Sequence, residues 1–452
     1  MKEINTSQNA QLETVDTLIH ARWVVPVEDA RSERILAHHS IAILAGTIVN
    51  ILNTELAKKR YQAKDEIQLD EHVVIPGLIN AHTHGAMCLF RGMADDLHLM
   101  DWFNQHIWPA EEQWVNEQFV WDGSMLAFAE MLRGGTTCFS DMYFFPNIVA
   151  KAAHEAGIRA NISVPILDFP SAWAQNADDY LHKGLQLHDD YRNHPLIEVN
   201  FGPHSPYTVS DEPLSRIQTL AEEMDGTIQI HLHETAGEVE DAIAATGKRP
   251  LQRLHELGLL TPRLQAVHMT QIDAEDLALL SSTGTHVIHC PESNLKLASG
   301  FCPTDKLIKA GINVALGTDG AASNNNLDMF GEMRTAALIA KAVAGDASAL
   351  PAAQALKMAT LNGAKALGID NRVGSLEVGK EADIVAISMS SPECQPVYHV
   401  ISQLVYSCNS DKVTDVWVAG QRMLDHQHLT TLDESSIVKA AKDWANKIAQ
   451  HD

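Results

Sequence analysis

The chain has 452 residues, of which 33 are Lys or Arg and 58 are Asp or Glu, so its formal net charge is −25 at pH 7. This acidic balance argues against nucleic acid or an anionic membrane surface as a partner, because both are bound through basic patches. Hydrophobic residues make up 45% and charged residues 20%. That composition is typical of a globular protein and excludes disorder as the main state.

The cellular location is predicted from three observations. The sequence contains no apolar run of the roughly 18 residues that cross a bilayer. Residues 1–16 contain no apolar core of the kind found in signal peptides. The cysteines form no CxxC pair and are too few for a disulfide framework, which predicts reduced thiols in a cytoplasmic protein. They are Cys88, Cys138, Cys290, Cys302, Cys394 and Cys408.

Both ends of the chain are rich in short β-type runs, which are separated by turn residues such as Ala45-Gly46 and Ala419-Gly420. We expect one discontinuous β-sandwich domain, built from residues 1–75 plus 375–425. An amphipathic helix over residues 433–450 follows it. The runs are Leu18–Val27, Ser40–Ile51, Ile67–Val74, Ser375–Ser388 and Val413–Leu424.

The middle of the chain, residues 76–374, alternates β-type runs with helical patterns. Eight such runs predict a parallel (β/α)8 barrel of the TIM type. A doubly wound sheet is the alternative, but the sequence has neither a GxGxxG nor a Walker motif. The strands are expected at Val74–Ala81, Thr136–Met142, Ile158–Val164, Ile197–Gly202, Thr227–His231, Gln265–His268, Thr285–His289 and Asn313–Gly317. Intervening helices are expected at Val120–Arg133, Asn147–Ala156, Pro213–Met224, Arg249–Leu257 and Ala274–Leu280.

Polar side chains gather where these strands end. His82 and His84 follow the first strand, and their spacing of two places both imidazoles on one face of an extended chain. Barrel enzymes keep their chemistry at the carboxyl ends of the strands. The other strand ends contribute His204, His231, His233, Glu234, His268 and Asp319.

Three neutral imidazoles and one carboxylate suit a divalent ion such as Zn²⁺ and leave a position for water. His82, His84, His231 and Asp319 meet that count. His231 and His233 share a face of their strand, so the spacing allows either to bind. No Lys ends the fourth strand, where a carbamylated side chain could bridge two ions, so one metal is favoured over two.

Longer motifs extend this pattern. The sequence resembles the amidohydrolase superfamily in three segments and one further histidine. They are VIPGLINAHTH (74–84), HLHE (231–234), GTDG (317–320) and His268. Four further segments resemble its 5-methylthioadenosine/S-adenosylhomocysteine deaminase group. They are HTHGAMCLFRGMADDLHLMDWF (82–103), GPHSPYT (202–208), PESNLKLASG (291–300) and TDGAASNNNLDMFGEMR (318–334).

The resemblance implies roles for the strand-end residues. It selects His231 over His233 as the third histidine ligand. Metal-activated water would attack C6 of an adenine ring, Glu234 would deliver a proton to N1, and ammonia would leave. His268 would orient the attacking water, and Asp319 could take its proton.

The resemblance also implies substrate contacts. Glu111 matches the carboxylate that grips the ribose 2′- and 3′-hydroxyls, although a solvated Glu at a helix start would look the same. His204 would reach the purine or ribose, with a strand-end histidine satisfied by its neighbours as the alternative. Trp102 would form a wall near the 5′ substituent, with core packing as the alternative, and Ser323 would contact the substrate unless it serves only its turn.

One departure bears on specificity. The stretch after the third strand, residues 163–173, contains no Lys or Arg for the carboxylate of S-adenosylhomocysteine. We therefore expect a preference for 5-methylthioadenosine, unless Arg91 or a neighbouring subunit supplies the cation.

The alternatives are a triazine hydrolase, a guanine or cytosine deaminase, or a noncatalytic assembly protein on the same scaffold. Triazines and free bases carry no ribose for Glu111 to bind, and noncatalytic relatives typically lose metal ligands that this chain retains. The resemblance implies a cytoplasmic homo-oligomer that acts on a small nucleoside.

Overall fold

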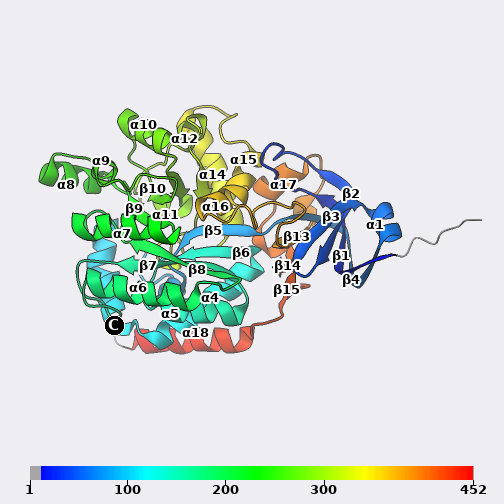
Figure 1. Ribbon diagram of the computed structural model, residues 1–452, viewed down its shortest axis with the longest axis horizontal. Helices are drawn as coiled ribbons and strands as arrows, with labels where there is room; N and C mark the ends of the chain where they lie inside the picture. Colours follow the sequence, from blue (N-terminus) through cyan, green and yellow to red (C-terminus); the bar gives the residue numbers. More distant parts are fainter. Residues whose placement is uncertain (1–11, 451–452) are drawn as a thin grey trace, which may run out of the picture.

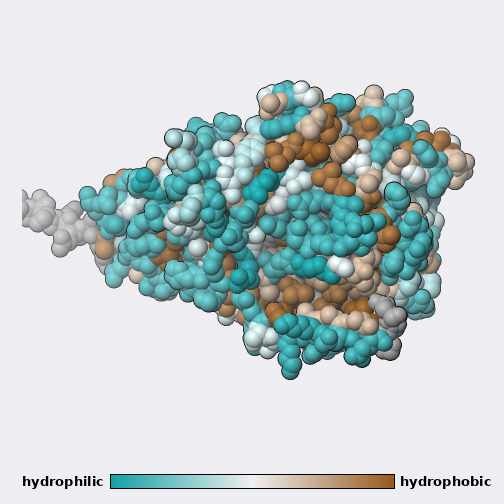
Figure 2. All heavy atoms as spheres, turned by 180° about the vertical axis from the view of Figure 1, so that it is seen from behind, coloured by the Kyte–Doolittle hydropathy of each residue, from teal (hydrophilic) through white to brown (hydrophobic). Residues whose placement is uncertain are grey.

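The computed structural model describes residues 12–450, which form two eight-stranded sheets at opposite ends of an elongated body (Figure 1). The expected fold class is confirmed: a nearly closed parallel barrel is joined to a separate mixed sheet drawn from both ends of the chain. Among residues 12–450, none of the helices has the length and apolar character that a membrane span requires. Figure 2 shows a mostly hydrophilic face on which hydrophobic side chains form separate patches.

The barrel strands are all parallel neighbours in chain order. Its longest strand, β7, is buried at every position, as expected for a strand covered on both faces. The strands are β5 (Leu78–Thr83), β6 (Thr136–Asp141), β7 (Arg159–Ile166), β8 (Ile197–Pro203), β9 (Ile228–Leu232), β10 (Leu264–His268), β11 (His286–His289) and β12 (Val314–Leu316).

The two end strands of the barrel meet through polar contacts. The Asn80 side chain on β5 donates to Thr318 Oγ1 at 2.7 Å and accepts from the Thr318 amide at 3.0 Å. The Asp319 amide donates to the His82 carbonyl at 3.0 Å. These bonds hold the carboxyl ends of β5 and β12 side by side, which places their polar residues over the same opening.

Helices surround the barrel, and one of them, α18, lies along its side (Figure 1). They are α2 (Leu99–Trp102), α3 (Trp108–Trp114), α4 (Glu117–Arg133), α5 (Pro146–Ala156), α6 (Ala177–Tyr191), α7 (Asp211–Met224), α8 (Ala236–Thr246), α9 (Pro250–Glu256), α10 (Ala274–Thr283), α11 (Pro291–Lys296), α12 (Thr304–Lys309), α13 (Ala321–Asn324), α14 (Met329–Ala344), α15 (Ala352–Met358), α16 (Leu361–Ala366), α17 (Val400–Tyr406) and α18 (Glu434–Ala449). A π-helical turn (Phe103–Ile107) joins α2 to α3.

The second sheet brings together strands from residues 13–76 and 384–429. Its spatial order is β16 (His428–Leu429), β15 (Gln421–Asp425), β14 (Val413–Val418), β13 (Ile384–Ser388), β4 (Tyr61–Pro76), β1 (Glu13–Val24), β2 (Leu36–Leu44) and β3 (Thr47–Asn53). Helix α1 (Thr54–Arg60) follows β3. The division at residues 75, 375 and 425 stays a prediction, and residues 1–11 of its first part lie outside the described residues.

Four of the expected β-type runs differ from the structure. Ser40–Ile51 covers parts of two strands, β2 and β3, and Val413–Leu424 covers β14 and part of β15. The run Val74–Ala81 is split, because β4 ends at Pro76 in one sheet and β5 begins at Leu78 in the other. The chain changes sheets at Gly77, where a Cβ atom would lie 2.0 Å from Thr137 Oγ1. Of the run Ser375–Ser388 only Ile384–Ser388 is a strand, and the preceding turns include Gly379 at a φ of +95°.

The C-terminal helix belongs to the barrel side of the molecule. Trp444 of α18 is buried, and its indole N–H donates to Asp122 Oδ2 on α4 at 2.9 Å. Its ring centroid lies 5.2 Å from that of Phe119. The amphipathic pattern that predicts this helix therefore reflects packing against α4.

A buried ion pair joins the barrel to the second sheet. Arg159, on β7, is 3% exposed and donates to both carboxylate oxygens of Asp383 at 2.9 and 3.0 Å. It also donates to Glu381 Oε2 at 2.7 Å. We expect Arg159→Met to lower the free energy of unfolding by about 3–5 kcal/mol, because it leaves a buried carboxylate without its cation.

Urea denaturation measures this loss. Arg192 is the matched control, since its pair with Asp189 is exposed on both sides, and Arg192→Met should cost less than about 1 kcal/mol. Equal costs for the two variants would contradict a role for Arg159 in joining the sheets.

Candidate active site

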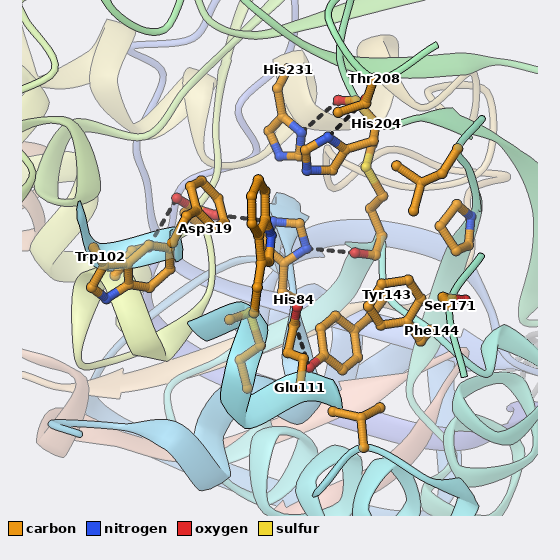
Figure 3. Close-up of a pocket in the computed structure, with 18 of the residues that line it drawn as sticks. His84, Trp102, Glu111, Tyr143, Phe144, Ser171, His204, Thr208, His231 and Asp319 are labelled. Atoms are coloured by element: carbon orange, nitrogen blue, oxygen red, sulfur yellow. Dashed lines mark hydrogen bonds and ion pairs between the residues drawn. The ribbon is translucent and has the colours of Figure 1, made fainter. Parts of the chain in front are cut away.

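Four side chains converge at the carboxyl end of the barrel. His82 and His84 come from β5 and the residue after it, His231 from β9, and Asp319 from the loop after β12. Each of these four side chains offers one potential metal-ligand atom, and the four atoms all lie within 4.8 Å of one another. Asp319 Oδ1 is 3.5 Å from His82 Nε2 and 3.3 Å from His84 Nε2. Figure 3 shows His84, His231 and Asp319 around this point.

Each imidazole is oriented through its other nitrogen. His82 Nδ1 lies 2.7 Å from Gln229 Oε1. His84 Nδ1 lies 2.5 Å from the Met142 carbonyl oxygen, and His231 Nδ1 lies 2.7 Å from the His204 carbonyl oxygen. These oxygens only accept, so all three Nδ1 atoms carry the proton. The three Nε2 atoms therefore face the centre, in the arrangement typical of metal-binding histidines.

The geometry calls for a cation. The Nε2 atoms of His82 and His231 are 3.2 Å apart, and two lone pairs at that distance repel unless positive charge lies between them. Burial opposes charge on His84, yet the hydrogen bond to Asp319 and the charge of that carboxylate raise the pKa of His84 to about 9. Its Nε2 therefore holds a proton near neutral pH unless a metal ion displaces that proton. Three imidazoles and a carboxylate suit one divalent ion.

Asp319 is held by three donors. Ser293 and Ser323 donate to Oδ2 at 2.6 and 3.0 Å, and the Gly320 amide donates to Oδ1 at 2.8 Å. Burial opposes its ionisation, but the bonds to His82 and His84 keep the pKa of Asp319 well below its usual range. The carboxylate is thus charged and fixed in direction.

His233 points away from this cluster. Its Nδ1 donates to the Gln271 carbonyl at 3.0 Å, and its Nε2 accepts from the Leu251 amide at 3.1 Å. Both ring nitrogens are occupied by main-chain groups, so its role is structural. Of the two histidines that strand spacing left open, the structure brings His231 to the cluster.

Glu234 turns inward because the strand has ended. Strand β9 stops at Leu232, and His233 adopts a φ of +52°, which reverses the direction of the next side chain. Glu234 Oε2 lies 3.8 Å from His268 Nε2. Burial, with the nearby charge of Asp319, raises the pKa of Glu234 to about 8, so near neutral pH this carboxyl group holds a proton.

His268 ends β10 and is fixed from behind. Its Nδ1 lies 2.9 Å from Asn294 Oδ1, and its backbone has a φ of +75°. Positive φ is unusual for a histidine and is found where the surroundings impose a conformation. The ring edge bearing Nε2 therefore faces Glu234 and the cluster.

A cavity of about 650 Å³ opens over these residues. The predicted contacts Trp102, Glu111, His204 and Ser323 all line it, together with Glu234, His268 and Asp319. Figure 3 shows Trp102, Glu111 and His204 on different sides of this space. Sequence positions spread over more than 200 residues thus contribute to one chamber.

Glu111 lies on α3, after the π-helical turn, and faces the cavity rather than solvent. Tyr143 Oη donates to its Oε1 at 2.8 Å (Figure 3). Burial raises the pKa of Glu111 to about 7, although the Tyr143 hydrogen bond lowers it. Tyr143 was not predicted from the sequence. Its position just after β6, at the carboxyl end of a barrel strand, is the sequence feature that could have identified it.

The cavity wall is apolar and its charged residues are acidic. Its charged residues other than histidine are Glu111, Glu112, Glu234 and Asp319, and no Lys or Arg among residues 12–450 lines it. Phe169, Pro170 and Ala172, from the stretch that lacks cations, contribute to the wall.

Arg91, the alternative cation, does not line this cavity. It pairs with Glu130 and donates to the Asn325 carbonyl at 3.0 Å. Its charge is therefore already neutralised by an ion pair within the fold. Other residues that sequence analysis missed stand behind the site: Gln229 contacts His82, Ser293 contacts Asp319 and Asn294 contacts His268.

The chain is similar to known proteins over most of its length. A 5-methylthioadenosine/S-adenosylhomocysteine deaminase of Teredinibacter turnerae is 53% identical over 435 residues, covering 96% of this chain and 98% of the relative. A zinc-bound adenosine deaminase structure from Xanthomonas campestris has a TM-score of 0.96 at 48% identity, covering 97% and 100% of the two chains.

More distant structures share the fold. An atrazine chlorohydrolase from Arthrobacter aurescens has a TM-score of 0.88 at 22% identity, covering 95% of this chain and 99% of that one. Residues 73–423 match the amidohydrolase family directly. With that match over most of its length and a relative of 53% identity, the chain belongs to the amidohydrolase family.

Proposed function

We propose that the chain is a metal-dependent aminohydrolase that removes the C6 amino group of 5-methylthioadenosine, giving the inosine analogue and ammonia. Adenosine and S-adenosylhomocysteine are further candidate substrates. The observation that carries the proposal is a single cavity that opens onto the four-residue cluster and is lined by the carboxyl groups of Glu111 and Glu234. The names of the relatives point to the same substrates.

His82, His84, His231 and Asp319 would hold one divalent ion, which we propose is Zn²⁺. The convergent Nε2 atoms and the fixed carboxylate support this set. Such an ion lowers the pKa of a bound water toward neutrality and so supplies a nucleophile. The remaining chemistry falls to the side chains around it.

Glu234 would act as the proton donor to N1 of the adenine ring. Its raised pKa keeps a proton available near neutral pH, and protonation at N1 prevents full negative charge on the ring during attack at C6. His268, held by Asn294, would orient the attacking water. Asp319 would accept its proton and return it to the departing amino group. The proton of the new C6 hydroxyl would pass to Glu234 as the carbonyl forms, which restores the proton that Glu234 gave to N1.

The other contacts would fix the nucleoside. Glu111 would accept hydrogen bonds from the ribose 2′- and 3′-hydroxyls, because its Oε2 remains free beside the oxygen that Tyr143 occupies. His204 would contact the purine or ribose, Trp102 would pack near the 5′ substituent, and Ser323 would contact the substrate while it holds Asp319.

The cellular setting is also part of the proposal. The six cysteines are buried and unpaired, which fits a reducing cytoplasm. The family resemblance implies a homo-oligomer acting on a small nucleoside.

The apolar wall leads to a prediction about specificity. We expect kcat/KM for 5-methylthioadenosine to exceed that for S-adenosylhomocysteine by about 10- to 100-fold, because the amino-acid carboxylate would be desolvated without a cation. Steady-state ammonia release with both substrates measures the ratio.

Ala172 lines the wall and offers a matched pair of variants. Ala172→Arg should raise kcat/KM for S-adenosylhomocysteine, whereas Ala172→Met adds length without charge and should not. Equal kcat/KM values for the two substrates in the unaltered protein would contradict the prediction.

The proposed function is tested by ammonia release from a panel of substrates. The panel contains 5-methylthioadenosine, S-adenosylhomocysteine, adenosine, guanine, cytosine and a chloro-triazine, each with Zn²⁺-loaded protein. Turnover of the adenosine derivatives supports the proposal. Turnover of a free base or triazine alone would replace it with the alternative of a base deaminase or triazine hydrolase. No ammonia release from any compound would favour a noncatalytic protein.

A further inference from the structure

Two buried glutamine side chains lie behind the metal cluster, on neighbouring strands of the barrel. Gln229 is on β9 and Gln265 on β10, directly opposite each other in the strand register, and both are fully buried. Gln229 stands two residues before His231, so it faces the barrel interior as His231 does. Neither side chain lines the substrate cavity.

Main-chain carbonyls fix the orientation of both amides. Gln265 Nε2 donates to the Ala366 carbonyl at 2.8 Å, and Gln229 Nε2 donates to the Ala81 carbonyl at 2.9 Å. A carbonyl oxygen can only accept, so each amide nitrogen must face its carbonyl. Gln265 Oε1 then accepts from Gln229 Nε2 at 2.6 Å, and Gln229 Oε1 is left facing His82.

The orientation decides which nitrogen of His82 carries its proton. Gln229 Oε1 lies 2.7 Å from His82 Nδ1, so Nδ1 must donate and Nε2 keeps its lone pair for a metal. His84 and His231 obtain the same tautomer from main-chain carbonyls. His82 is thus the histidine of this cluster whose tautomer depends on a side chain that can be substituted.

We propose that Gln229, held by Gln265, is a positioning residue that fixes His82 in the Nδ1–H tautomer and thereby sets the metal affinity of the site. The inference rests on the proposed metal-dependent function. It concerns metal binding in the absence of substrate, so its failure is distinguishable from a wrong choice of substrate.

The test is the affinity for Zn²⁺, measured by competition with a chromophoric chelator. Gln229→Met keeps the length but removes the acceptor, and should weaken Zn²⁺ binding by about 10- to 100-fold. Gln229→Glu presents an acceptor oxygen to His82 in either protonation state and should restore most of the affinity. Ser140→Ala, which removes a different acceptor of Gln229 Nε2, should bind as the unaltered protein does.

The absorption spectrum of the Co²⁺-loaded protein gives a second readout. A shifted spectrum in Gln229→Met, with that of Ser140→Ala unchanged, is expected if the orientation of His82 is lost. Gln265→Met should weaken Zn²⁺ binding by a smaller factor than Gln229→Met. If Gln229→Met does not fold, Gln265→Met tests whether the Zn²⁺ affinity depends on the orientation of Gln229. Unchanged affinity in the folded glutamine variants, or equal losses in Gln229→Met and Gln229→Glu, would overturn the proposal.

Discussion

Replacing Glu234 with Gln is expected to lower kcat for 5-methylthioadenosine by about 10²- to 10⁴-fold, the usual contribution of a positioned proton donor. Gln keeps the shape of the side chain but cannot deliver a proton to N1. Because Glu234 lies outside the four-residue cluster, the variant should bind Zn²⁺ as the unaltered protein does. Steady-state kinetics and metal analysis measure the two properties separately.

Glu240→Gln is the control for this change. Glu240 is exposed on α8 and does not line the cavity, so the same loss of charge there should leave kcat unchanged. A Glu234→Gln variant that keeps full kcat with its metal in place would exclude Glu234 as the donor. A variant that loses its metal would assign Glu234 to the metal site instead.

Replacing Glu111 with Gln should have the second largest effect. Hydrogen bonds to a charged group contribute about 1.5–3 kcal/mol, so loss of the carboxylate should lower kcat/KM for 5-methylthioadenosine by about 10- to 100-fold. The loss should fall mainly on KM, since Glu111 would hold the ribose and not the reacting ring. A 2′,3′-dideoxy analogue serves as the control substrate and should be turned over equally by both proteins.

The pH dependence of KM tests the same residue. Burial raises the pKa of Glu111 to about 7, so the carboxyl group gains a proton as the pH falls through that value. The protonated oxygen then no longer accepts a hydrogen bond from the ribose. KM for 5-methylthioadenosine should therefore rise on the acid side. In Glu111→Gln this rise should be absent, and an identical rise in both proteins would assign it to another group.

The positions of the metal-site residues could be predicted because strand geometry is local. A spacing of two places His82 and His84 on one face, and the carboxyl ends of parallel strands meet at one end of a barrel. Alternation of strands and helices sufficed to predict the barrel. The break at Gly77 was missed, because it depends on Thr137, which lies 60 positions further along the sequence.

Contacts that depend on distant partners could not be predicted. Strand spacing left His231 and His233 equivalent, and the choice between them depends on the carbonyl of Gln271 and the amide of Leu251. Tyr143 and Gln229 gain their roles only from the side chains opposite them, Glu111 and His82. Residues that support a site are therefore harder to identify from sequence than residues that form it.

Hydrolysis at C6 of an adenine nucleoside can be observed in a single incubation. Zn²⁺-loaded protein is mixed with 5-methylthioadenosine in ¹⁸O-labelled water, and the products are identified by mass spectrometry with a parallel ammonia assay. Hydrolysis at C6 gives the inosine analogue with one heavy oxygen in the base and one ammonia for each nucleoside consumed, and this is the expected result. Unchanged nucleoside, or release of free adenine, would contradict it.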